Sequence, residues 1–135
     1  MAVELAVELV SPEEVSYSGA AEMVIVRTAE EGDIAFQAGH VPFLGVLATW
    51  SVDVLRAGGE RDSFAVHRGF VEVSHNKVTI LSDVSEAAGE IDVSRAEKAR
   101  DRAGGALKAD PDDAAALEAL ERAELRLRVA ASASA

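Results

Sequence analysis

The apolar residues of this chain change their spacing once, near residue 92, and that change divides the fold. Before it, apolar and polar residues alternate in short runs such as Val3 to Leu9, the period of a half-buried β-strand. After it, apolar residues recur every three or four positions, the period of an amphipathic helix. The sequence therefore predicts an all-β antiparallel sandwich or barrel over residues 1–88, followed by an antiparallel two-helix hairpin over residues 89–135.

Turn signals separate the apolar runs of the first region at intervals of roughly ten residues, as in Ala57-Gly58-Gly59-Glu60. This spacing is typical of an antiparallel sandwich or barrel. The expected strands are Val3 to Leu9, Val15 to Ser18 (stopping at Gly19), Met23 to Thr28, Ile34 to Phe36, Phe43 to Leu47, Trp50 to Arg56, Ser63 to His67, Gly69 to Ser74 and Lys77 to Asp83.

The helical region contains two start signals. Asp92 is a good N-cap, since its carboxylate can accept backbone N–H bonds at the positive end of the helix dipole. Asp110-Pro111 predicts a second start, with aspartate at N-cap and proline at N1. The expected buried faces are Val93, Ala96, Ala99, Ala103 and Leu107 on the first helix, and Leu117, Leu120, Ala123 and Leu127 on the second.

The first helix has little apolar surface to bury. Its face is mostly alanine, and each methyl contributes on the order of 0.8 kcal/mol. Gly104 and Gly105 each cost about 1 kcal/mol relative to alanine within a helix. We therefore expect a hairpin held by weak contacts, able to detach from the sandwich or to open. Amide exchange over residues 92–130 as slow as that of the sandwich core would contradict this hypothesis.

The charge is unevenly distributed between the two regions. The net charge is −11, and residues 1–91 carry 5 basic and 15 acidic side chains. An acidic body of this kind should repel nucleic acid and anionic lipid headgroups. The chain has no cysteine, no apolar run long enough for a membrane span and no basic N-terminal leader.

The stretch from Gly32 to Leu47 is a shaped connection between strands that lacks a nucleophile beside a base. Gly32 can take a positive φ, and Pro42 biases Val41 to an extended form. A fixed loop without chemistry predicts a surface that docks on a partner.

This stretch resembles the epsilon-subunit family of F-type ATP synthases, whose members usually read G-x-x-G-x-x-P-G-H-x-P-L-L here. The matching residues are Gly32, Gly39, His40, Pro42 and Leu44, whereas Ala35, Ala38 and Phe43 depart from the pattern. Further stretches resemble the family in the right order: Val10-Ser11-Pro12, Ser18-Gly19, Ala65 to Val73, Asn76 to Asp83, and Ile91-Asp92.

The resemblance implies a non-catalytic rotor subunit of the central stalk of a proton-translocating bacterial enzyme, coupling gamma to the c-ring. Its hairpin would inhibit ATP hydrolysis by extending toward the alpha and beta subunits, where its arginines would meet acidic residues. The implied location is the cytoplasmic face of the plasma membrane, peripherally bound. The implied partner-binding residues are Glu31, Gly32, Asp33, Gly39, His40, Pro42, Gly69 and Phe70; a merely solvated acidic turn at Glu31 to Asp33 is the alternative.

Ile91 to Ala96 resembles the I/L-D-x-x-R-A element that binds a regulatory ATP in some members of the family. The implied ligands are Ile91, Asp92, Arg95, Arg102, Arg122 and Arg126. Converging guanidiniums suit a triphosphate. The alternative is helix capping together with the ion pairs Glu118–Arg122 and Glu124–Arg128. Arg126 has no acidic residue three or four positions away, so this pattern predicts that it is the arginine most available to meet another group.

Two other classes of function remain open from the residues. A stand-alone protein-interaction module would have the same sandwich and helical arm. An enzyme or metal protein would use His40, His67 and His75, but these show neither i, i+4 spacing nor a companion ligand motif. No required cofactor and no metal site are expected.

Overall fold

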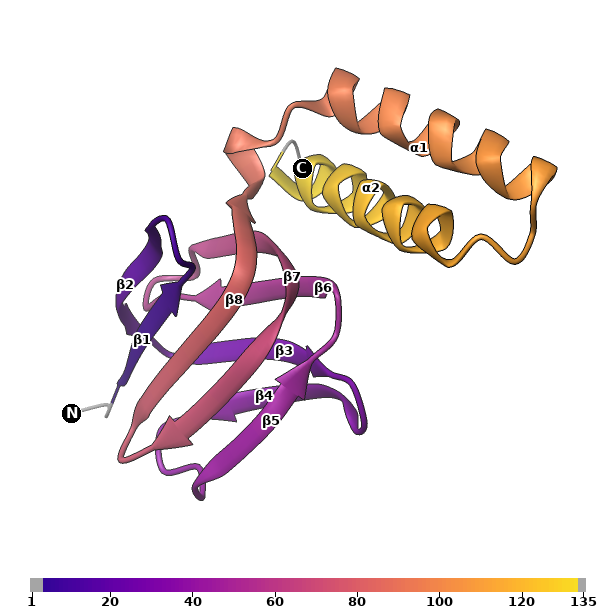
Figure 1. Cartoon of the computed structure of the whole chain (residues 1–135). Helices are drawn as coiled ribbons and strands as arrows, with labels where there is room; N and C mark the ends of the chain where they lie inside the picture. Colours follow the sequence, from indigo (N-terminus) through magenta and orange to yellow (C-terminus); the bar gives the residue numbers. More distant parts are fainter. Residues whose placement is uncertain (1–3, 134–135) are drawn as a thin grey trace.

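The computed structural model describes residues 4–133, which form a β-sandwich followed by two helices (Figure 1). This confirms the predicted fold class. The strands are β1 (Leu5–Val10), β2 (Val15–Ala21), β3 (Met23–Thr28), β4 (Gly32–Gln37), β5 (Phe43–Leu47), β6 (Trp50–Leu55), β7 (Arg61–Ser74) and β8 (Lys77–Ala87). A short 3-10 helix, η1 (Ala88–Glu90), leads to α1 (Val93–Ala109) and α2 (Ala114–Ala133).

The long strand β7 joins the two layers of the sandwich. Its first half pairs with β6, and its second half pairs with β5, so it belongs to both layers. One layer has the order β2-β1-β8-β7-β5, and β3, β4 and β6 complete the other. All pairings are antiparallel except that of β1 with β8.

Several strand predictions were wrong in extent, and the largest differences are at β7, β2 and β8. The expected strands Ser63 to His67 and Gly69 to Ser74 are one strand, β7, which bends at Arg68 (φ 64°) and Gly69 (φ 151°). The interruption of the apolar pattern therefore marks a bend instead of a turn. Strand β2 continues through Gly19 to Ala21 because β1 supplies a partner along its whole length. Strand β8 extends to Ala87 because β7 pairs with it that far.

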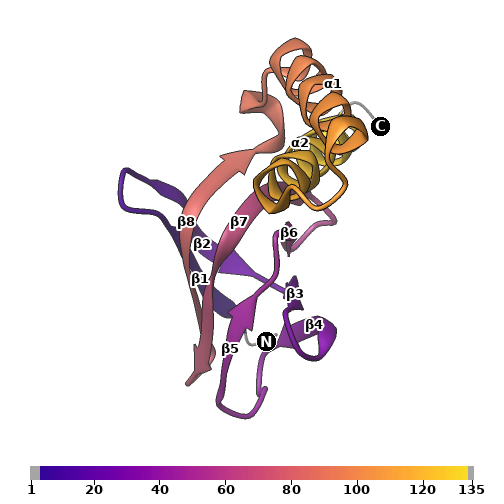
Figure 2. The same ribbon diagram turned by 45° about the vertical axis from the view of Figure 1, so that its right-hand side comes forward.

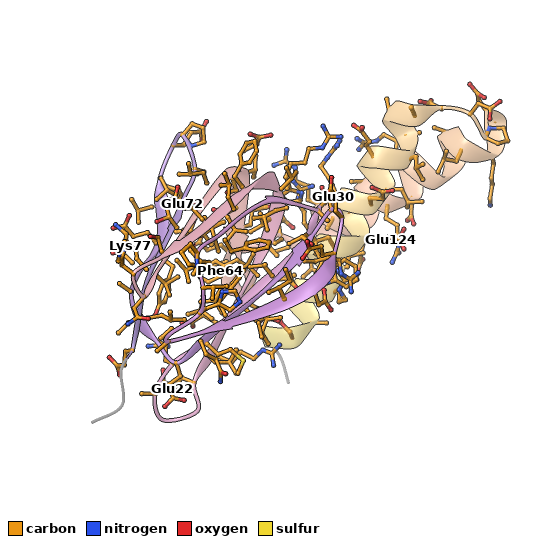
Figure 3. All side chains as sticks on the ribbon, turned by 90° about the horizontal axis from the view of Figure 1, so that it is seen from below. Glu22, Glu30, Phe64, Glu72, Lys77 and Glu124 are labelled. Atoms are coloured by element: carbon orange, nitrogen blue, oxygen red, sulfur yellow. The ribbon has the colours of Figure 1, made fainter. Side chains whose placement is uncertain are left out.

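The core fills the space between the layers with aliphatic side chains and the rings of Phe36 and Phe64. Figure 3 shows Phe64 among these interior side chains, whereas Glu22, Glu72 and Lys77 lie at the periphery. The fully buried members include Leu5, Leu9, Val24, Val26, Phe36, Val54, Val66, Val71 and Ile80. Strict alternation in β3, where Val24 and Val26 point inward, is what the period-2 pattern predicts.

The first helix begins where the sequence predicts. The Asp92 side chain accepts a hydrogen bond from the Arg95 N–H at 3.1 Å. The predicted start at Asp110-Pro111 was wrong, since Asp110 ends α1 and its carboxylate accepts from the Asp112 N–H. Helix α2 instead begins after Asp113, whose carboxylate caps the Ala116 N–H at 3.0 Å. Of three nearby aspartates, the last caps the helix.

The hairpin packs on the sandwich through α2, and α1 lies on the far side of α2 (Figures 1 and 2). Ala96 and Ala103 of α1 are buried as predicted, but Val93 is exposed. On α2 the predicted face was partly wrong: Leu117 is 49% exposed, and Leu125 and Val129 are buried in place of Leu127. The buried face differs because Leu125 and Val129 pack with Ala65 of β7 and with Ile91, near the C-terminal end of α2.

Within residues 4–133, no helix is both long and apolar enough to cross a membrane. The same part of the chain has no cluster of three or more His, Cys, Asp or Glu side chains able to hold a metal. The three histidines lie apart: His40 against Phe36, His67 beside Glu86, and His75 in the turn between β7 and β8.

Candidate interaction site

An exposed apolar strip crosses the outer face of the sandwich. We define the outer strip as Val10, Val46, Phe70 and Leu81. Strand register places these residues side by side, with Val46 opposite Phe70, Phe70 opposite Leu81, and Leu81 opposite Val10. Val46, Phe70 and Leu81 are 52%, 55% and 53% exposed. Adjacent exposed apolar residues of this kind mark an interaction surface.

A hollow of about 350 Å³ lies along the outer strip, lined by Val10, Gly69, Phe70 and Leu81 among others. Gly69 keeps this surface in shape, because a Cβ at its φ of 151° would collide with the Leu81 carbonyl oxygen. Gly69 and Phe70 were predicted as partner-binding residues, and the structure places both at this surface.

The acidic turn between β3 and β4 is fixed by side-chain hydrogen bonds. The Thr28 hydroxyl accepts from the Glu31 N–H at 2.9 Å and donates to the Gly32 carbonyl at 3.0 Å. The Arg27 guanidinium contacts Asp33 at 2.7 Å, and that hydrogen bond holds the pKa of the Asp33 carboxyl below its usual value. Glu30 and Glu31 remain exposed, so the turn presents carboxylates on a rigid backbone.

The second predicted loop, between β4 and β5, is tied to a different turn. The Gly39 N–H donates to the Asn76 side chain at 2.7 Å, joining this loop to the β7–β8 turn. The His40 ring packs edge-on against Phe36, with centroids 4.8 Å apart. Pro42 is exposed beside it.

The structure does not bring all of the predicted partner-binding residues together. Strand β4 runs from the turn at Glu31 to the loop at Gly39, and its six residues span roughly 20 Å, so Glu31 and Asp33 lie near one end of the strand and Gly39, His40 and Pro42 near the other. Phe70 lies on the outer face instead of at either turn. The predicted residues therefore mark separate areas of one body.

The Glu86 carboxylate contacts residues of both β7 and α2 where the hairpin meets the sandwich. The buried His67 contacts Glu86 through Nε2 at 2.9 Å, and Arg126 of α2 donates to the same oxygen at 2.7 Å. The hydrogen bond from His67, followed by that from Arg126, lowers the pKa of Glu86 to about 2. The carboxylate is therefore ionised at neutral pH and can only accept, so His67 Nε2 carries the proton.

The two faces of the Trp50 ring also connect the sandwich with the hairpin. The guanidinium carbons of Arg27 and Arg128 lie 3.4 and 3.5 Å from the ring centroid. Two groups that close to one centroid fit only on opposite faces of the indole. Arg27 belongs to β3 and Arg128 to α2, so the ring is clamped between sandwich and hairpin. Burial, and then the charge of Arg27, lower the pKa of Arg128.

Arg126, which has no acidic residue three or four positions away along its helix, meets Glu86 of β8 across the domain junction. Arg122 lines a cavity of about 800 Å³ between α2 and the sheet and lies 4.0 Å from Glu118. Arg95 and Arg102 of α1 do not line that cavity. Ile91 is buried against α2, and Asp92 caps α1.

Sequence reasoning missed Val46 and Leu81 of the outer strip, as well as Trp50 and Glu86. A signal existed for the strip: Leu81 lies on the opposite side of its strand from Val78 and Ile80, so that strand carries apolar residues on both sides. This pattern is typical of a strand whose second face is covered by a partner. The partners of Trp50 and Glu86 lie 78 and 40 positions away in Arg128 and Arg126. No local pattern reports pairs at that separation.

The family model described as "ATP synthase, Delta/Epsilon chain, beta-sandwich domain" matches residues 4–88. The chain is 42% identical over 128 residues to an ATP synthase epsilon chain of Streptomyces avermitilis, covering 95% of this chain and 96% of that one. It is 45% identical over 132 residues to an ATP synthase epsilon chain of Thermobifida fusca, covering 94% and 85%.

Two solved structures have the same fold. A chain in the cryo-EM structure of the Euglena gracilis mitochondrial ATP synthase (OSCP, F1 and c-ring) superposes with a TM-score of 0.72 at 24% identity, covering 97% of this chain and 81% of that one. A chain of the Tetrahymena thermophila mitochondrial ATP synthase central stalk and c-ring gives 0.61 at 19% identity, covering 99% and 98%.

Proposed function

Because the chain belongs to the ATP synthase delta/epsilon family and is an epsilon subunit, we propose that it is a rotor component of the central stalk. In this proposal the sandwich couples the gamma subunit to the c-ring of a bacterial, proton-translocating enzyme. The hairpin restrains ATP hydrolysis. The chain is a non-catalytic subunit, bound peripherally at the cytoplasmic face of the plasma membrane.

The outer strip carries the proposal. Val46, Phe70 and Leu81 form a contiguous apolar surface on three adjacent strands, and each is more than half exposed. Covering such a surface against a partner removes apolar area from water, which contributes about 25 cal/mol per Å². We assign this surface to gamma, and the shape imposed by Gly69 supports that assignment.

The acidic turn is assigned to the c-ring. Glu31 and Asp33 stand on a backbone already fixed by Thr28 and Arg27, so little conformational entropy is lost when a basic loop binds. The Gly39-His40-Pro42 loop, at the opposite end of β4, forms a second contact with the surrounding stalk.

The hairpin is the proposed regulatory element. Helix α1 carries Arg95, Lys98 and Arg102, spaced so that they share one exposed side. An extended hairpin would present this side to acidic residues of the alpha and beta subunits. In the docked position described above, α2 and α1 stay beside the sandwich and hydrolysis proceeds.

We also propose that the hairpin binds a regulatory ATP. The ligands would be Ile91, Asp92, Arg95, Arg102, Arg122 and Arg126, and binding would favour the docked hairpin through its differential affinity for the two states. Because Glu86 already engages Arg126, ATP must displace that ion pair or use the remaining arginines. Calorimetric titration with ATP tests this, with Arg100→Ala as control. We expect saturable heat that Arg95→Ala removes; an absence of heat contradicts ATP binding.

Co-purification tests the docking proposal. We expect Phe70→Ser and Leu81→Ser together to abolish recovery of gamma with the tagged chain, whereas Val93→Ser, which alters an exposed valine outside the strip, leaves recovery unchanged. A wild-type pull-down without gamma would favour a stand-alone interaction module. Membrane ATPase activity measured with and without residues 92–135 tests the regulatory proposal, and we expect hydrolysis to rise on truncation.

A further inference from the structure

The contacts that fix the hairpin are concentrated in little more than one turn near the end of α2. Leu125 and Val129 are buried in a small cluster with Ala65 and Ile91. Between them along the helix, Arg126 reaches Glu86 and Arg128 reaches Trp50. Toward the start of α2, the contact with the sandwich is an ion pair between Arg68 and Glu118, whose side chains are 64% and 51% exposed. Exposed pairs of this kind contribute little.

We call the stack of Arg27, Trp50 and Arg128 the Trp50 clamp, and through Arg27 it is connected to the acidic turn. Arg27 stacks on one face of Trp50 and also holds Asp33 through two hydrogen bonds, at 2.7 and 3.3 Å. Its guanidinium therefore has one side on the ring and its edge on the carboxylate, a geometry that suits the planar fork of arginine. Asp33 does not take part in the hairpin contacts, yet it orients the group on which the clamp depends.

We propose that Asp33, Arg27, Trp50 and Arg128 form a single relay that latches the hairpin to the sandwich and makes the latch sensitive to whatever engages the acidic turn. A cationic group that binds the Asp33 carboxylate would break its hydrogen bonds with Arg27. Arg27 would then be less ordered on the Trp50 ring, which loosens the stack and favours hairpin opening. The inference rests on the proposed function in one respect, namely that the hairpin moves.

The stack should make a measurable contribution. The cation–π attraction ranges from roughly 0.5 to 2 kcal/mol as the pair is desolvated, which converts to a change of about 2- to 30-fold in an equilibrium constant. Trp50 is half-buried, so we expect the middle of this range. Loss of Asp33 leaves the stack possible but less ordered, so its effect should be smaller.

Native-state hydrogen exchange of the full-length chain tests the relay. We expect Arg128→Gln to raise the opening equilibrium of residues 120–130 about tenfold, and Asp33→Asn to raise it about 2- to 5-fold. Exchange in β3 serves as the measure that each variant still has a folded sandwich. Glu30→Gln removes a charge from the same turn without touching Arg27, and Arg100→Gln removes an exposed arginine from α1; neither should change exchange in α2.

Wild-type exchange in Arg128→Gln would overturn the latch. Equal exchange in Asp33→Asn and Glu30→Gln would overturn the relay. Trp50 is the single tryptophan of the chain, so its emission gives a second readout, and opening should shift it to longer wavelength in proportion to the exchange result. These measurements use the isolated chain, whereas restraint of hydrolysis is measured in membranes, so failure of one proposal is distinguishable from failure of the other.

Discussion

The sandwich and the hairpin are stabilised in different ways. The sandwich has a continuous core of sixteen buried apolar residues between its layers. The hairpin meets the sandwich through a cluster of five, two of them alanines, supplemented by the Glu86–Arg126 ion pair and the Trp50 clamp. Aliphatic packing resists local opening, whereas a few polar contacts can be exchanged for contacts with a partner. We therefore expect the sandwich to stay folded while the hairpin detaches and docks again.

The largest expected effect comes from the sandwich core. Phe36 is fully buried, so Phe36→Ala should lower the free energy of unfolding of the sandwich by about 3–5 kcal/mol. Urea denaturation followed by circular dichroism measures this. An effect below about 1 kcal/mol would mean that the two regions are packed alike.

The equivalent change at the hairpin should act locally. Leu125→Ala removes the largest buried side chain of the α2 contact and should weaken docking by about 2–3 kcal/mol. Hydrogen exchange should accelerate in residues 114–133 while exchange in β3 and β7 stays as in the wild type. Equal acceleration in the strands would show that the chain unfolds as one cooperative unit.

Acid should loosen the junction through Glu86. Its pKa is lowered from 4.5 to about 2 in the folded chain, so its contribution is fully present above about pH 4.5 and is lost as the pH falls toward 2. This lowering of the pKa corresponds to roughly 3 kcal/mol, which solvent screening of the partly exposed Glu86 side chain reduces to the order of 2 kcal/mol. Stability measured between pH 6 and 3 should decline more steeply in the wild type than in Glu86→Gln. Parallel profiles would exclude Glu86 as the cause.

The smallest expected effect is a gain in the stability of α1. Gly105 lies within α1 at a negative φ, and a Cβ there would meet no atom within 4 Å. Gly105→Ala should therefore stabilise α1 by about 0.5–1 kcal/mol. Slower amide exchange confined to α1 is the expected result, with Gly58→Ala, at a φ of 94°, as a contrasting substitution that should destabilise. No change in α1 would mean that its helix is already limited by its contact with α2.

The sequence predicts most of what depends on neighbouring residues. Alternation located β3 to the residue, and Asp92 was correctly assigned as a helix cap. Apart from the start of α2, where the choice lay among neighbouring aspartates, the errors arose where a distant partner decides. The bend at Arg68 and Gly69 resembled a strand end, because pairing with β5, β6 and β8 is what keeps β7 continuous. Likewise, Leu125 replaced Leu127 at the buried face because of where the sheet lies.

The same limit applies to the candidate site. Gly69 and Phe70 were predicted from a local motif, and both lie at the outer strip. The contacts of Glu86 and Trp50 with their arginine partners were not predicted, since only the folded chain brings β3, β6, β8 and α2 together. Arg126 is the clearest case: no acidic residue lies three or four positions away along its helix, but Glu86 contacts it in the folded chain.

The position of the latch has a mechanical consequence. Helix α2 spans 20 residues, or roughly 30 Å, and it is gripped close to one end. A slight tilt of the helix at Arg126 and Arg128 therefore produces a larger displacement at its other end, where α1 and α2 join. A small loosening around one indole ring would thus be amplified several-fold at the tip, because most of the helix lies beyond the grip.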